Sequence, residues 1–258
     1  MSFIVFSGIM LPFIGTASGA ALCFFIKCKS TRVLENVLSG FAGGVMMAAS
    51  FFSLIVPAYR ILHFKDYAHL RIITGVGLGI LFIIFCNKVI DYLNKKRKKT
   101  LFGKRFAFIL AIIIHNIPEG IATGVAFSAA ATFITGMDSG AAFILALSIA
   151  LQNIPEGAII SMPVFTDGNT RIKAFSMGAL SGIIEPVAAF LAFIFSHFAT
   201  VLLPYLLAFA AGAMIHVTTT ELIPCVLRDK GNLRSVLFGV LSFIFGFFIM
   251  AYLDLILA

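Results

Sequence analysis

Long apolar runs, interrupted by short polar segments, repeat along almost the whole chain. Most of them reach the roughly 20 residues that a helix needs to cross the hydrocarbon core of a bilayer. They predict eight transmembrane helices, at residues 3–26, 36–59, 72–94, 106–130, 139–164, 174–196, 200–226 and 235–257. Because these segments occupy nearly the whole chain, the pattern predicts one all-α, polytopic membrane domain over residues 1–258.

The composition strengthens this interpretation. The chain is 60% hydrophobic and only 12% charged, whereas soluble domains are about half apolar and a quarter charged. The first 26 residues lack the charged start and the small-residue cleavage site of a signal peptide, so we expect them to form the first span.

The basic residues predict an orientation. Sixteen of the 19 lysines and arginines fall in or beside the loops after the first, third, fifth and seventh spans. The densest run is Lys95–Lys99, followed by Lys104 and Arg105. The positive-inside rule therefore places these loops in the cytoplasm and both termini outside. A basic run beside a membrane typically faces anionic lipid, and no aromatic residues are interleaved to favour nucleic acid.

A weak internal similarity links the two halves of the chain. The second predicted span contains Phe41-Ala42-Gly43-Gly44-Val45-Met46, and the seventh contains Phe209-Ala210-Ala211-Gly212-Ala213-Met214. These two spans would cross in opposite directions, so the similarity suggests an inverted repeat, as in many transporters. Helices rich in glycine and alanine also look alike by composition alone, and the sequence leaves both explanations open.

Two similar six-residue strings lie inside predicted spans: 115–120 (His-Asn-Ile-Pro-Glu-Gly) and 152–157 (Gln-Asn-Ile-Pro-Glu-Gly). A carboxylate within a span is costly, so each string indicates a functional site. His115 and Glu119 are four residues apart and share one helix face, as do Gln152 and Glu156. Imidazole, carboxylate and amide ligands together suit Zn²⁺ or Cd²⁺, and can accept Fe²⁺ or Mn²⁺.

Four acidic residues fall deep in spans: Glu119, Glu156, Glu185 and Glu221. No lysine or arginine lies at comparable depth, so these carboxylates should either take up a proton or bind a cation. Glu221 lies nearer the cytoplasmic end of its span. It is as consistent with a solvated residue on the exit path as with a residue of the metal site.

Pro118 and Pro155 should bend their helices and free backbone oxygens at the depth of the strings. The alternative is a pair of ordinary proline kinks beside protonated, structural carboxylates. Gly75, Gly77 and Gly79 in the third span would allow close helix contact, as at a dimer interface, although glycine-rich spans are common.

These motifs and this topology closely resemble the ZIP (Zrt/Irt-like, zinc–iron permease) family of divalent-metal transporters. The resemblance rests on the two strings, the eight spans with both termini outside, the Ser-Gly-x-x-Glu-Pro stretch at 181–186 and the cytoplasmic loop after the third span. The residues that it assigns to metal sites are His115, Asn116, Glu119, Gln152, Asn153, Glu156 and Glu185.

The resemblance implies two adjacent metal positions. The histidine, the glutamine and the two string glutamates would form the primary one, and the glutamates would bridge to a second, completed by the two asparagines and Glu185. It also implies a homodimer, import into the cytoplasm, and spans 1, 4, 5 and 6 sliding against spans 2, 3, 7 and 8. Many members have histidine where this chain has Gln152, which places zinc selectivity in question. The cytoplasmic loop is rich in lysine rather than histidine, so a metal-sensing role is not expected.

The expected function is therefore transport of divalent metal cations, zinc first and cadmium, iron or manganese next, across the cell membrane. We expect no catalytic residues and no cofactor other than the transported metal. One alternative is an intramembrane metal-dependent hydrolase, which would need an activated water and an open coordination position. Another is a proton-coupled carrier of an organic cation, which would not explain the spacing of His115 and Glu119.

Overall fold

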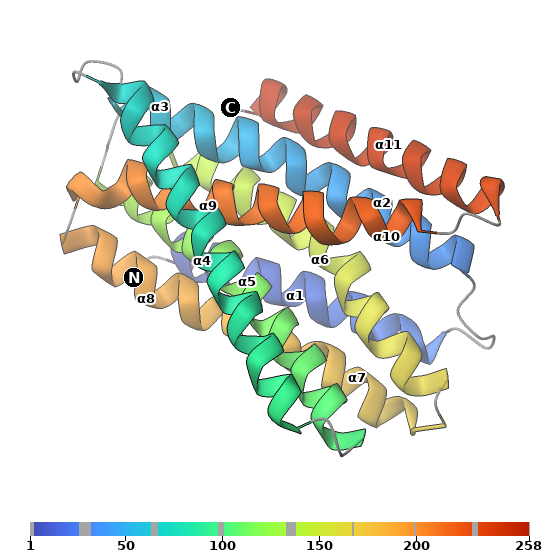
Figure 1. Cartoon of the computed structure of the whole chain (residues 1–258). Coiled ribbons are helices and arrows are strands. Elements are labelled where there is room, and N and C mark those ends of the chain that lie inside the picture. Colours follow the sequence, from blue (N-terminus) through green and yellow to red (C-terminus); the bar gives the residue numbers. More distant parts are fainter. Residues whose placement is uncertain are drawn as a thin grey trace.

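In the computed structural model, every element of the described residues is helical (Figure 1). It describes residues 3–25, 32–62, 67–97, 101–132, 138–166, 168–198, 200–228 and 232–257. In chain order the elements are α1 (Phe3–Ala21), η1 (Leu22–Phe24), α2 (Arg32–Ala49), η2 (Ser50–Ile55), α3 (Val56–Leu62), α4 (Ala68–Arg97), α5 (Leu101–Ala131), α6 (Ser139–Thr166), α7 (Arg171–Ser181), α8 (Ile184–Phe198), η3 (Thr200–Leu202), α9 (Leu203–Val217), η4 (Thr218–Leu222), α10 (Ile223–Leu227) and α11 (Leu233–Leu257).

Within the described residues, seven helical segments are long and apolar enough to cross a membrane: Phe3–Phe24, Arg32–Leu62, Ala68–Ile90, Ser139–Met162, Arg171–Phe195, Leu203–Leu227 and Leu233–Ile256. The prediction of an all-α, multi-pass membrane protein is thus confirmed. Helix α5 coincides with the remaining predicted span and is 31 residues long, but its side chains over 101–113 lie outside the described part. The eighth crossing therefore stays a prediction.

The start of α1 and the end of α11 lie toward the same end of the bundle (Figure 1). This is the arrangement that an even number of crossings produces. The orientation relative to the membrane stays a prediction. The structure does not describe Lys27, Lys29, His63, Lys65, Lys98, Lys99 or Lys230. It also leaves undescribed the side chains of Lys95, Lys96, Arg97, Lys104, Arg105 and His197.

The sixth predicted span is not one helix. Helix α7 ends at Ser181, Gly182 and Ile183 form a turn, and α8 starts at Ile184. Pro186 explains the break, because proline lacks the N–H that would bond to the carbonyl of Gly182, and its ring would clash with that carbonyl in a continuous helix. In the first turn of a new helix the missing N–H costs nothing.

Two other spans contain a π-helical segment at matching positions. The segments η2 and η4 begin at Ser50 and Thr218, with the same sequence offset that separates Phe41 from Phe209. Their first hydroxyls also make the same bond, since Ser50 Oγ donates to Met46 O at 2.7 Å and Thr218 Oγ1 to Met214 O at 2.9 Å. Hence the correspondence between these spans goes beyond their glycine and alanine content.

Helix pairing follows the same correspondence. Helix α2 packs mainly on α11 and α9 on α4, while α1 packs on α6 and α8 on α5. Gly75 and Gly79 of α4 face α9, where any side chain would overlap Ala208 or the Phe209 carbonyl, whereas a Cβ on Gly77 would have no neighbour within 4 Å. The close contact expected of this glycine motif is thus made within the chain by two of its three glycines.

Candidate metal centre

The polar residues of the two strings meet Glu185 inside the bundle, where α1, α5, α6 and the α7–α8 junction converge. Five of them are almost completely buried, with at most 1% of each residue exposed: Asn116, Glu119, Gln152, Asn153 and Glu185. Glu156 on α6 is half-buried. His115 lies on α5, but its side chain is outside the described part. The structure therefore brings together six of the seven predicted residues.

Hydrogen bonds between helices hold two of the carboxylates in place. Gln152 Nε2 on α6 donates to Glu119 Oε1 on α5 at 2.9 Å. Asn116 Nδ2 on α5 donates to Glu185 Oε1 on α8 at 2.8 Å, and lies 3.2 Å from the carbonyl oxygen of Ser181. The amides of the two strings thus act first as donors that orient neighbouring carboxylates.

The two strings place their asparagines in equivalent surroundings. Asn116 Nδ2 bonds to the carbonyl of Ser181 at the end of α7, and Asn153 Nδ2 to the carbonyl of Pro12 in α1 at 3.4 Å. Next to these bonds, Gly120 faces the carbonyl of Glu185, and Gly157 faces that of Thr16. The glycine that ends each string therefore lets its helix approach a neighbouring backbone closely enough for the asparagine to reach it.

Three carboxylates share this space. Glu119 experiences repulsion from both Glu156 and Glu185, and Glu185 experiences repulsion from Glu156. The hydrogen bonds described above come from neutral amides, which do not cancel carboxylate charge. A cation among these oxygens would relieve the repulsion, since buried like charges are tolerated only when they are neutralised.

Every one of the five buried residues also presents an oxygen without a hydrogen-bond partner. These atoms are Asn116 Oδ1, Glu119 Oε2, Gln152 Oε1, Asn153 Oδ1 and Glu185 Oε2. Across the described residues, Ser128 Oγ is the only other buried side-chain atom in this condition. Leaving a buried polar atom unpaired is costly and rare. Five such oxygens in one cluster form an electron-rich surface that fits a hard or borderline divalent cation.

The carboxylates alone do not make a metal cage. Among the side chains that the structure describes, no three His, Cys, Asp or Glu residues form a group that could hold a metal ion. The amide oxygens of Asn116, Gln152 and Asn153 would have to complete any coordination shell, together with residues outside that part such as the His115 imidazole.

The break between α7 and α8 places Glu185 in the first turn of α8. Its own N–H bonds to Gly182 O at 3.1 Å, which closes the turn. The positive end of a helix dipole stabilises a carboxylate there. Gly182, Glu185 and Pro186 of the Ser-Gly-x-x-Glu-Pro stretch thus act together: they end one helix, start the next and aim the carboxylate into the cluster.

Sequence reasoning missed one polar member of this region. Thr16, on α1, is buried, and its Oγ1 donates to Glu185 Oε1 at 2.9 Å. Nothing in the chain near Thr16 resembles the two strings, and α1 contains no charged residue. Only the packing of α1 on α6, α7 and α8 reveals this contact.

The remaining candidates lie elsewhere. Glu221 is half-buried in η4, which packs mainly on α2, α9 and α10 rather than on the helices of the cluster. His216 is half-buried near the end of α9, and His69 is exposed. Glu221 thus remains a candidate exit residue.

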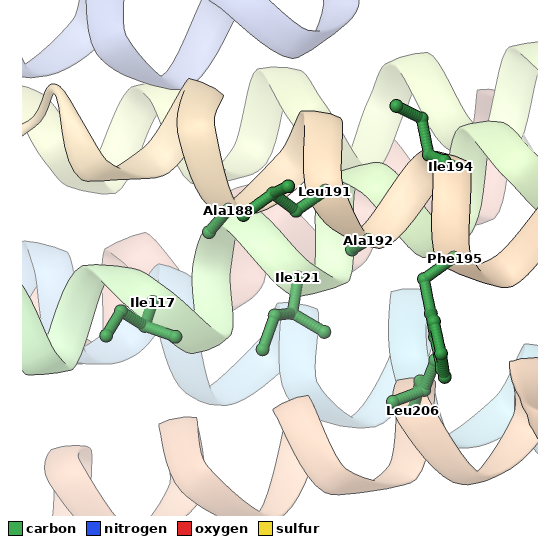
Figure 2. A pocket seen from close by; sticks show the side chains of 8 residues that line it. All are labelled: Ile117, Ile121, Ala188, Leu191, Ala192, Ile194, Phe195 and Leu206. Atoms are coloured by element: carbon green, nitrogen blue, oxygen red, sulfur yellow. The ribbon is translucent and has the colours of Figure 1, made fainter.

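An apolar cavity of about 660 Å³ lies beside the cluster, between α5, α8 and α9 (Figure 2). Its wall is made of aliphatic and aromatic side chains, among them Ile117, Ile121, Leu191 and Phe195. Although Ile117 follows Asn116 in the chain, the wall residues that the structure describes offer no side-chain oxygen or nitrogen to a cation.

A multi-pass helical bundle with a buried, oxygen-rich cluster at its centre is the architecture of a polytopic membrane transporter. The chain belongs to the ZIP zinc transporter family. The family model described as "ZIP Zinc transporter" matches residues 103–254, which include both strings and Glu185.

Relatives match over nearly the whole chain. Zinc transporter ZIP11 of Xenopus tropicalis is 30% identical, over 96% of this chain and 95% of its own length. Zinc transporter ZIPB of Bordetella bronchiseptica is 32% identical, over 94% of this chain and 77% of its own. Zinc transporter GufA of Myxococcus xanthus is 31% identical, over 81% and 84%. These relatives are transporters rather than enzymes, so the hydrolase alternative is set aside.

Proposed function

We propose that this protein carries divalent transition-metal cations, zinc most readily and cadmium, iron or manganese less so, into the cytoplasm. The metal would bind within the membrane to the cluster of His115, Asn116, Glu119, Gln152, Asn153, Glu156 and Glu185. The observation that carries the proposal is the set of five buried oxygens without hydrogen-bond partners, all contributed by these residues. The names of the relatives, all zinc transporters, support zinc as the first candidate.

In this proposal a hydrated ion enters from outside and sheds water against the four primary ligands, His115, Glu119, Gln152 and Glu156. Asn116, Asn153 and Glu185 hold a second position, to which Glu119 and Glu156 bridge. Amide and carboxylate oxygens replace the lost hydration, and the positive charge relieves repulsion among the three carboxylates. Rearrangement of the bundle then opens the cluster to the cytoplasm.

The proposed rearrangement is a sliding of the helices that carry the cluster, α1, α5, α6 and α7–α8, against the other spans. The helix pairings support such a division, because α1 packs on α6 and α5 on α8, while α2 packs on α11 and α4 on α9. The proposal includes eight crossings in one domain, both termini outside, a homodimer and location in the cell membrane.

The test is uptake of Zn²⁺, Cd²⁺, Fe²⁺ and Mn²⁺ into proteoliposomes that contain the full chain, compared with protein-free liposomes and with Glu156→Ala. Saturable uptake that Glu156→Ala abolishes would support the proposal and rank the metals. If folded wild-type protein moves none of the four metals, the proposal is wrong.

Acid is expected to inhibit uptake. Carboxylates bind metal only when deprotonated, so protons compete with the metal for the same oxygens. Protonation of a carboxylate therefore also assists release of the metal. With equal pH on both sides of the vesicle, the initial rate of Zn²⁺ uptake should fall from neutral to acidic pH. Raising the Zn²⁺ concentration should restore part of the rate. Uptake that does not respond to acid would contradict metal binding by deprotonated carboxylates.

Changing the glutamine of the second string should change metal preference. Gln152→His replaces an amide oxygen by an imidazole nitrogen, a ligand that suits zinc better than manganese. We expect the ratio of Zn²⁺ to Mn²⁺ uptake to rise in this variant. The substitution also removes the amide donor that bonds to Glu119 Oε1. Gln152→Ala removes the same donor and serves as the control for that loss. An equal ratio in Gln152→His and Gln152→Ala would contradict direct ligation at this position.

A further inference from the structure

Thr16 of α1 makes a contact that neither string predicts. Its Oγ1 lies 2.9 Å from Glu185 Oε1 and 3.4 Å from the carbonyl oxygen of Pro12. A hydroxyl has a single proton to donate. The bond to the carboxylate is both shorter and charge-assisted, so the proton goes to Glu185.

The two oxygens of Glu185 are treated differently. Oε1 accepts from Thr16 Oγ1 and from Asn116 Nδ2 at 2.8 Å, whereas Oε2 is buried without a hydrogen-bond partner. The last torsion of a glutamate is soft, so a carboxylate with no fixed contacts can exchange its two oxygens. Two donors from different helices, both directed at Oε1, hold the carboxylate plane and leave Oε2 free.

Thr16 itself has little freedom to move. A Cβ on Gly182 would lie 2.7–2.9 Å from three atoms of the Thr16 side chain, and a Cβ on Gly157 would overlap its carbonyl oxygen. The two glycines bring the α7–α8 junction and α6 directly against this residue. A β-branched side chain in a helix also has few rotamers. The hydroxyl is therefore a rigid donor.

We propose that Thr16 is a positioning residue for the metal cluster: its hydroxyl holds Glu185 Oε1 so that Oε2 faces the cation together with Asn116 Oδ1 and Asn153 Oδ1. The inference rests on the proposed function and extends the site to a fourth helical segment, α1. Groups that orient a ligand in this way typically change metal affinity by about 10–100-fold when they are removed.

The test compares variants that remove the donor with one that keeps it. Thr16→Val keeps the shape and removes the hydroxyl, Thr16→Ala removes both hydroxyl and methyl, and Thr16→Ser keeps the hydroxyl and removes the methyl. Equilibrium Zn²⁺ binding and the KM and maximal rate of Zn²⁺ uptake are measured for the full chain. We expect Thr16→Val and Thr16→Ala to weaken binding and raise KM about tenfold or more, and Thr16→Ser to stay close to wild type.

A purely structural role predicts the reverse order, because Thr16→Val preserves packing and Thr16→Ser does not. Wild-type affinity in Thr16→Val, or equal loss in Thr16→Ser, would therefore overturn the inference. Thr16→Val is also tested in a Glu185→Ala background. If the hydroxyl acts only through Glu185, Thr16→Val should change Zn²⁺ affinity there by less than about twofold. A tenfold effect that persists there would equally overturn it.

Failure of the inference is distinguishable from failure of the proposed function. Wild type and Glu156→Ala are measured in the same series. If wild type shows no Zn²⁺ uptake, or Glu156→Ala transports like wild type, the proposed function has failed. If these two behave as expected while Thr16→Val matches wild type, only the role of Thr16 has failed.

Discussion

Glu119→Gln is expected to abolish Zn²⁺ uptake, with a loss of at least about 100-fold in the initial rate, or about 2.8 kcal/mol. Glu119 is buried, one of its oxygens is held by Gln152, and the other has no hydrogen-bond partner. Glutamine matches its shape but removes the negative charge and one of the two oxygens. The measurement is zinc uptake by proteoliposomes that contain equal amounts of folded protein.

The matched control is Glu35→Gln, which makes the same chemical change in the first turn of α2, on a half-buried residue distant in sequence from both strings. We expect its uptake to stay near the wild-type rate. If Glu119→Gln and Glu35→Gln retain similar uptake, the buried cluster is not where the metal binds.

Gly19→Val is expected to prevent stable packing of α1 on α6. A Cβ at Gly19 would overlap the carbonyl oxygen of Ile154, and Ile154 lies between Asn153 and Pro155 in the second string. Backbone atoms cannot rotate away as a side chain does, so the helices must separate. Overpacking of cores commonly costs about 1–3 kcal/mol, and this backbone contact should lie at the upper end. Thermal stability of the purified protein in detergent is the measurement.

Gly77→Val provides the comparison, because a Cβ at Gly77 meets no atom within 4 Å. The helix-propensity change is the same in both variants. We expect a large drop in melting temperature for Gly19→Val and a small one for Gly77→Val. A similar drop in both would mean that the α1–α6 contact does not limit stability. Partial folding of Gly19→Val should also reduce Zn²⁺ uptake, because α6 carries Gln152, Asn153 and Glu156.

The predicted spans agree closely with the helices because the physics behind them is local. A membrane-crossing helix must satisfy its own backbone and present apolar side chains, and both requirements can be read from a window of about 20 residues. The breaks inside spans were harder to predict. Gly182 and Pro186 explain the α7–α8 turn once the structure shows it. The π-helical segments η2 and η4 begin at Ser50 and Thr218, and the sequence has no proline or glycine at either position.

The sequence by itself determined the class of protein, the approximate limits of its long apolar segments, and most of the polar residues that the bundle brings together, because carboxylates and amides inside apolar helices stand out against their surroundings. Only the tertiary structure decided which oxygens stay free. Thr16 and Glu185 lie 169 residues apart in the sequence, on α1 and α8, and close glycine contacts between helices bring them together. Hydrogen bonds across such distances in sequence depend on packing, which no local pattern encodes.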